Sequence, residues 1–181
     1  MHRQQIRRLV YLFIAFALSG CGGKEKFNVE QEIERFYTHQ DVFEKLATTG
    51  CEAREAMDTR FFRYPMDVTG DESESIQHYF ADIENLLNSM GLKQIVLRTI
   101  IAKDIDCSLY LSISDFSFLA DGYSFGYWYQ PADHGTYEYS EGFFSQETTE
   151  YRDANRVRGE EEVKFSIALE SGWYLQYYRY P

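Results

Sequence analysis

The sequence is poor in basic residues and in proline. Its 181 residues include 18 Lys and Arg against 29 Asp and Glu, which gives a formal net charge of −11. Phosphate binding needs clustered Lys and Arg, so this balance argues against nucleic acid as a partner. With 3 Pro, 44% hydrophobic and 17% aromatic residues, the composition is typical of a folded domain rather than of a disordered chain.

Motifs for catalysis and for metal binding are also missing. The chain holds no GxSxG, SxxK or HExxH motif and no glycine-rich phosphate loop followed by lysine. None of its four histidines has the i, i+4 spacing of a zinc site. Asp104 and Asp106 would supply at most part of a glycosidase or calcium site, and a solvated turn is the alternative. We therefore expect a protein that is not an enzyme and that uses no cofactor or metal.

The one long apolar run is too short to cross a membrane. Residues 9–18 are continuously apolar, about half of the ~20 residues that a spanning helix needs. The run follows the basic segment 1–8 and precedes the small residues Ser19 and Gly20. A basic segment, a short apolar segment and small residues in this order are typical of a secretory signal.

Leu18-Ser19-Gly20-Cys21 resembles the lipobox of bacterial lipoproteins, which is Leu, two small residues and Cys. The resemblance covers the export segment alone. It implies attachment of diacylglycerol to the Cys21 thiol, cleavage before Cys21 and acylation of the new amino terminus. Several acyl chains give stable membrane anchoring. Gly22, where an Asp would favour the inner membrane, implies an outer-membrane lipoprotein that faces the periplasm.

Cleavage before Cys21 removes three arginines and no acid, so the mature chain carries 15 − 29 = −14 charges. Cys51 and Cys107 are then the remaining cysteines, and in an oxidising compartment they can form a disulfide. Two buried free thiols are an equally weighted alternative. We expect a signal peptide over residues 1–20, a lipidated tether over 21–27 and a single domain over 28–181.

The domain begins with helical periodicity. Asn28 can cap a first helix that ends near Gly50 or continues through residues 52–57, and a second helix is expected over 73–90. Residues 58–72 are expected to form a loop. From residue 93 the period changes to two, which predicts five or six strands joined by hairpin turns. The predicted class is α+β, with both helices on one face of an antiparallel meander.

Two hairpins can be placed from the turn residues. Asp121-Gly122 predicts a two-residue turn that pairs Phe118 with Phe125, with a bulge near Ser114-Asp115. A three-residue loop, 170–172, pairs Leu169 with Trp173. Residues 136–146 are expected to form a further strand, and residues 147–162 a long mobile loop.

Runs of consecutive aromatic residues are the unusual feature. Because strand residues alternate between faces, these runs place large rings on both faces of the sheet. The helices cover one face, so the other carries Tyr and Trp with polar tips, a composition enriched at binding surfaces. A stiff solvated sheet is the alternative. The candidates for this surface are Tyr110, Trp128, Tyr174 and Tyr178.

These features favour a non-catalytic protein-binding module on the envelope. An acidic chain would suit a basic protein partner, and one such role is an immunity-type inhibitor of a periplasmic toxin. A glycan- or peptidoglycan-binding lipoprotein that uses exposed Tyr and Trp is the second hypothesis. An envelope hydrolase is disfavoured because no catalytic site is evident.

Overall fold

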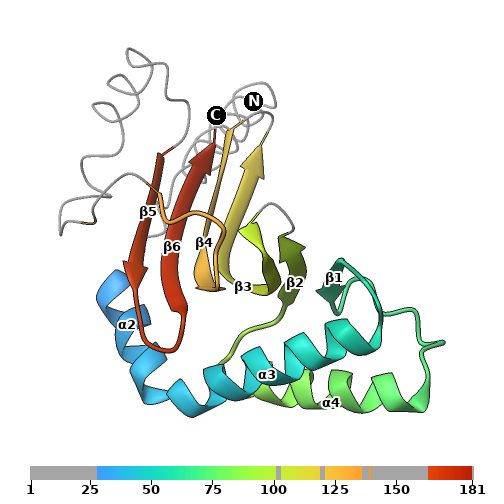
Figure 1. Cartoon of the computed structure of the whole chain (residues 1–181). Coiled ribbons are helices and arrows are strands. Elements are labelled where there is room, and N and C mark those ends of the chain that lie inside the picture. Colours follow the sequence, from blue (N-terminus) through green and yellow to red (C-terminus); the bar gives the residue numbers. More distant parts are fainter. Residues whose placement is uncertain (1–27, 101–102, 119–120, 136–138, 140–162, 181) are drawn as a thin grey trace, which may run out of the picture.

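The structure is a computed structural model that describes residues 28–100, 103–118, 121–135, 139 and 163–180. It confirms the predicted α+β class: three helices pack on one face of an open, six-stranded antiparallel sheet (Figure 1). The elements are α2 (Val29–Thr38), α3 (Gln40–Ala56), β1 (Phe61–Tyr64), α4 (Glu74–Ser89), β2 (Ile95–Ile100), β3 (Ile105–Phe118), β4 (Asp121–Tyr129), β5 (Val163–Ala168) and β6 (Trp173–Tyr180).

The first predicted helix is two helices. Asn28 caps α2 as expected, and its side-chain oxygen accepts the Gln31 N–H at 3.0 Å. His39 leaves the helical conformation, with φ of −120°, and α3 begins after it. The break lets Phe36 and Phe43 reach the same part of the core, where their ring centroids lie 4.9 Å apart and both side chains are fully buried.

Of the two expected ends of the first helical region, the later one is observed: α3 continues past Gly50 to Ala56. A Cβ atom at Gly50 would lie 2.9 Å from a Leu97 methyl group and 3.1 Å from one of Leu109. The absence of a side chain at Gly50 therefore allows α3 to lie close to β2 and β3. The next residue, Cys51, forms a disulfide with Cys107 on β3. Close contact and a covalent link thus hold α3 to the middle of the sheet.

The strand order is β1-β2-β3-β4-β6-β5. Strands β2, β3 and β4 form the expected meander, and β1 joins its edge beside β2. The last two strands form a hairpin that joins the sheet through β6, so the meander order is not kept there. This hairpin has the predicted register, with Phe165 opposite Tyr177 and Ile167 opposite Leu175. Gly172 has φ of +81°, the conformation that three-residue hairpin loops require.

Two predictions about the strands are wrong. Residues 61–64, expected in a loop, form the edge strand β1, because Phe62 and Tyr64 bury their rings against Phe80 of α4. Asp121 and Gly122 lie within β4 instead of forming the turn, and Phe118 pairs with Asp121.

The observed register of β3 and β4 is explained by the side chains that it buries. It places Tyr127 beside Leu111, so that both side chains are buried under the helices. The expected bulge is present between Ser112 and Ser114, close to its predicted place. The predicted strand over 136–146 and the predicted loop over 147–162 lie outside the described residues, apart from Tyr139.

The centre of the core contains a buried polar contact. The Tyr127 hydroxyl donates to the Glu32 backbone carbonyl at 2.8 Å and lies 2.9 Å from the Glu32 carboxylate, which pairs with Arg35 at 2.8 Å. Glu32 itself is buried, although it is a charged residue of the first helical turn. Burial, with the Glu32 charge second, raises the pKa of Tyr127. This contact fixes α2 against β4.

The raised pKa predicts a loss of stability at high pH. The unfolded chain releases the tyrosine proton near pH 10 while the folded chain keeps it, so the free energy of unfolding falls as pH rises above 10. Tyr127 contributes up to about 1.4 kcal/mol per pH unit to this slope. We expect Tyr127→Phe to be less stable at pH 8 by about 1–3 kcal/mol, but to lose stability less steeply above pH 10.

Urea unfolding at pH 8, 10 and 11 measures both effects. Tyr37→Phe is the matched control, because it removes a tyrosine hydroxyl from an exposed position on α2. An alkaline slope in Tyr127→Phe equal to that of the wild-type chain would contradict the prediction.

Candidate binding surface

The face of the sheet opposite the helices carries the predicted aromatic side chains. Tyr110, Trp128 and Tyr174 are consecutive register partners on β3, β4 and β6. They form a lateral row across the centre of the sheet, called here the aromatic row. Tyr178 lies on the same face but four residues further along β6, about 13 Å away at ~3.3 Å per residue, and is not part of the row.

The rings of the aromatic row are already in contact with other groups. Trp128 packs on Tyr110 with ring centroids 4.5 Å apart, and the Arg98 guanidinium carbon lies 4.5 Å from the Trp128 ring centroid. The His134 ring lies 4.5 Å from that of Tyr174. Each ring of the row therefore already packs against at least one neighbouring group.

The tip of Tyr110 is fixed by Asp115. The Tyr110 hydroxyl donates to one Asp115 carboxylate oxygen at 2.5 Å, and the Ser112 hydroxyl donates to the other. The bulge between Ser112 and Ser114 brings Asp115 to this face, opposite Ser124. Burial first, and then the Asp115 charge, raises the pKa of Tyr110. This hydroxyl is therefore a neutral, oriented group at physiological pH.

The turn over residues 131–135 docks beside Tyr174. Gln176 donates to the Asp133 carbonyl at 2.9 Å, and the Asp133 carboxylate pairs with Lys164 at 3.2 Å. The Gly135 N–H donates to the same carboxylate at 3.0 Å, and with Lys164 it lowers the pKa of Asp133. Gly135 has φ of +76° and lies against the Lys164 carbonyl, where a side chain would not fit. The turn is thereby held on the sheet.

Sequence reasoning missed Arg98, Asp115 and His134 as neighbours of the row. Arg98 is the single charged residue within the apolar run 95–102, which is a signal that could have identified it. The positions of Asp115 and His134 depend on the bulge and on the docked turn. No short-range pattern in the sequence indicates these contacts.

Charge divides unevenly between the two layers. The helices hold 3 basic and 10 acidic residues, a net charge of −7, whereas the six strands hold 4 basic and 3 acidic residues, a net charge of +1. Among the described helices and strands, the acidic excess therefore lies on the helical layer. The strands, in contrast, are close to neutral, and their basic residues include Arg63, Arg98 and Lys164.

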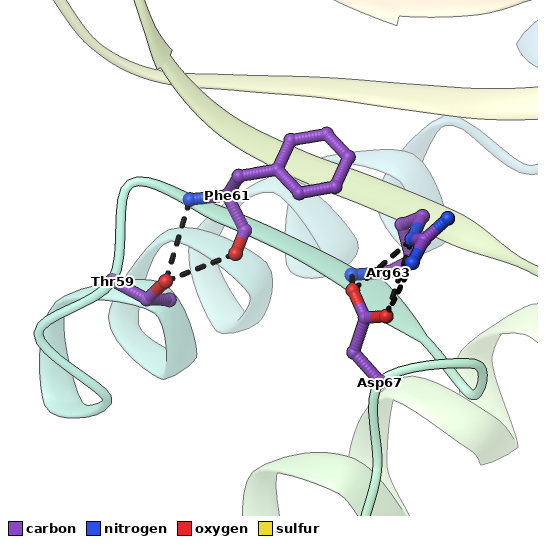
Figure 2. A network of polar contacts seen from close by, with 4 residues as sticks. All are labelled: Thr59, Phe61, Arg63 and Asp67. Atoms are coloured by element: carbon purple, nitrogen blue, oxygen red, sulfur yellow. Dashed lines mark hydrogen bonds and ion pairs between the residues drawn. The ribbon is translucent and has the colours of Figure 1, made fainter.

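The outward edge of β1 is closed to an added strand, as Figure 2 shows. The Arg63 N–H donates to the Asp67 carboxylate at 2.8 Å, and the Asp67 N–H donates to the Arg63 carbonyl at 2.7 Å. The Thr59 hydroxyl donates to the Phe61 carbonyl at 2.9 Å and accepts the Phe61 N–H at 3.4 Å. A partner strand would have to displace both side chains, which makes this edge a poor site for strand addition.

Removal of the Asp67 carboxylate should open this edge. In Asp67→Ala the Arg63 N–H and guanidinium lose their acceptor, and we expect concentration-dependent self-association through β1. Light scattering at increasing protein concentration measures the apparent mass. Asp71→Ala, at an exposed aspartate of the following loop, should behave as the wild-type chain. An Asp67→Ala chain with the wild-type mass at every concentration would show that the edge is protected in another way.

Within the described ranges, no helix combines the length and hydropathy that are required to cross a bilayer. No three His, Cys, Asp or Glu side chains in the same ranges are grouped so that they could hold a metal ion. In comparisons with known proteins, no family model, no curated protein and no solved structure is similar to this chain.

Proposed function

We propose that this chain is a lipid-anchored, non-catalytic protein-binding module of the bacterial envelope. The lipobox resemblance supports an anchor at Cys21 and an orientation towards the periplasm. The Cys51–Cys107 disulfide is of a kind that persists in oxidising compartments, which is consistent with export. The anchor would hold a small, acidic domain at the outer membrane.

We propose that the partner binds at the aromatic row. Tyr110, Trp128 and Tyr174 lie side by side on central strands, on the face that the helices leave uncovered. Trp, Tyr and Arg are the residues most enriched among binding hot spots, and Arg98 completes this set. Tyr110 and Arg98 are oriented by neighbouring side chains, which lowers the entropy cost of ordering them on binding.

The contacts of the rings favour a protein over a glycan. A sugar ring stacks on an open aromatic face, but Trp128 is already packed against Tyr110 and Arg98, and Tyr174 against His134. A protein partner can instead contact ring edges, the Tyr hydroxyls and the guanidinium. Binding to peptidoglycan is the competing outcome of the experiment below.

An immunity-type inhibitor of a periplasmic toxin is the role that fits this arrangement best. The analogy with such inhibitors rests on the size, the charge and the expected cellular location of the chain. The helical layer, with net charge −7, would attract a basic partner over distances near the Debye length and raise the association rate. The aromatic row would then supply the specific contacts.

Affinity capture tests the binding function. A Cys21→Ser chain, freed from the membrane, is used as bait in solubilised envelopes and with isolated sacculi. We expect it to recover a discrete protein partner, and we expect Trp128→Ala and Tyr174→Ala each to weaken that affinity at least 10-fold, because both truncate the row.

Tyr37→Ala is the matched control for capture. It removes an aromatic side chain that is 49% exposed on α2, away from the row, and it should keep wild-type affinity. Urea midpoints show whether each variant is folded. Binding to sacculi without any protein partner would favour the glycan hypothesis and overturn the proposal.

The anchor is tested separately by metabolic labelling. The native chain should incorporate a fatty-acid analogue and fractionate with the outer membrane, whereas the Cys21→Ser chain should remain unlabelled, because the thiol is the attachment point implied by the lipobox. An unlabelled native chain in the cytosolic fraction would refute the envelope location and the choice of a periplasmic partner.

A further inference from the structure

Arg98 lies half-buried on the outer face of the sheet. Its side chain starts from β2 and reaches Trp128 on β4, so it crosses β3 between them. Its register partner on β3 is Ser108, whose small side chain is fully buried. The guanidinium carbon lies 4.5 Å from the Trp128 ring centroid. The strand order and a small neighbour thus hold the cation against the indole.

This cation has no acidic partner among the residues that the structure describes. Other arginines of the same domain are satisfied: Arg35 pairs with Glu32 at 2.8 Å and Arg63 with Asp67 at 2.7 Å. The Arg98 side chain has neither an ion pair nor a hydrogen bond to the described residues, and its Nε is buried without a partner. Burial lowers the pKa of Arg98, because its charged form has lost part of its hydration.

A half-buried charge of this kind is costly until an anion reaches it. Contact with an indole ring offsets part of this cost, and a charge-assisted, two-bond contact with a carboxylate would offset more. A guanidinium presents its donors along its edge, so packing on Trp128 leaves the fork available for a planar, two-oxygen acceptor. The geometry is therefore suited to a single carboxylate.

We propose that Arg98, packed on Trp128, binds a carboxylate of the protein partner. This inference rests on the proposed function and names the group that the partner must present to the aromatic row. Phosphate is the weaker candidate, because it carries more charge than one arginine can balance and phosphate sites gather several cations. In a chain of formal net charge −11, this unpaired cation would be matched only by a correctly placed acid of the partner.

The two tryptophans provide a direct measurement. Trp128 contacts Arg98, whereas Trp173 is fully buried on the opposite face of the sheet, so its indole N–H signal is an internal reference. The ¹⁵N-labelled Cys21→Ser chain is titrated with acetate at constant ionic strength. Acetamide, the neutral molecule of the same shape, and inorganic phosphate are titrated in parallel.

We expect acetate to shift the Trp128 indole signal saturably, with a dissociation constant in the millimolar range, and to leave Trp173 unchanged. Arg98→Gln should abolish this shift. Arg63→Gln is the matched control, because it removes an exposed arginine that is already paired, and it should retain the shift. An unresponsive Trp128, an equal shift with acetamide or tighter binding of phosphate would overturn the inference. A saturable shift that persists in Arg98→Gln would do the same.

Capture of the partner separates this inference from the proposed function. Arg98→Gln should weaken the affinity for the partner at least 10-fold, while Arg63→Gln should change it less than twofold. A partner that binds the row but is indifferent to Arg98→Gln would refute the carboxylate contact and leave the binding function intact. Acetate binding through Arg98 without any protein partner would refute the binding function and confine the finding to an anion site.

Discussion

The close contact between α3 and the sheet at Gly50 is the constraint on which the rest of the structure depends. Without a side chain at this position, the helix can approach β2 and β3 closely enough for Leu97 and Leu109 to pack on its backbone. The disulfide from the next residue then ties the helix to β3. In the chain-entropy model, closing a loop of 56 residues contributes about 4 kcal/mol. The contact at Gly50 and the disulfide at Cys51 together determine which face of the sheet the helices cover.

Once this face is fixed, alternation determines the other. Tyr127 and Trp173 point under the helices and are fully buried, whereas their neighbours Trp128 and Tyr174 point to the opposite face. The same residue types thus serve as core on one side and as a polar-tipped row on the other. On the core side, Phe43 packs against both Tyr127 and Trp173, with ring centroids 4.7 and 5.2 Å away. Burial of Tyr127 and Trp173 therefore places their sequence neighbours, Trp128 and Tyr174, on the outer face.

Elements governed by short-range rules could be predicted from the sequence. Turn chemistry alone predicts the three-residue loop before Trp173. Periodicity alone predicts α4 and the inward side chains of residues 107–111. The break at His39 and the strand β1 could not be predicted, and the sequence left open whether the helix ends near Gly50 or continues past it. Each of these is decided by a distant partner: the shared core of Phe36 and Phe43, the sheet beneath α3, and Phe80 of α4.

The candidate surface shows the same division. The alternation of strand residues between faces is enough to place Tyr110, Trp128 and Tyr174 on one face. Their alignment into a row also needs the register of β3 with β4, which the local turn signal predicted wrongly. The Arg98 contact needs in addition the order of β2, β3 and β4, because the side chain crosses an intervening strand. Long-range pairing is therefore what converts scattered aromatic residues into a surface.

The separation of charge between layers assigns different physical tasks to the two faces. A net charge of −7 on the helices acts at a distance, is weakened by salt and is insensitive to detail, so it can raise an association rate without selecting a partner. Arg98 acts only in contact, where a partner without a carboxylate at the matching position would leave a desolvated charge unpaired. If the chain binds a protein as proposed, that penalty would discriminate among basic proteins that the acidic layer attracts equally. On this proposal, attraction and selection of the partner could be altered independently, because the groups responsible lie on opposite sides of one sheet.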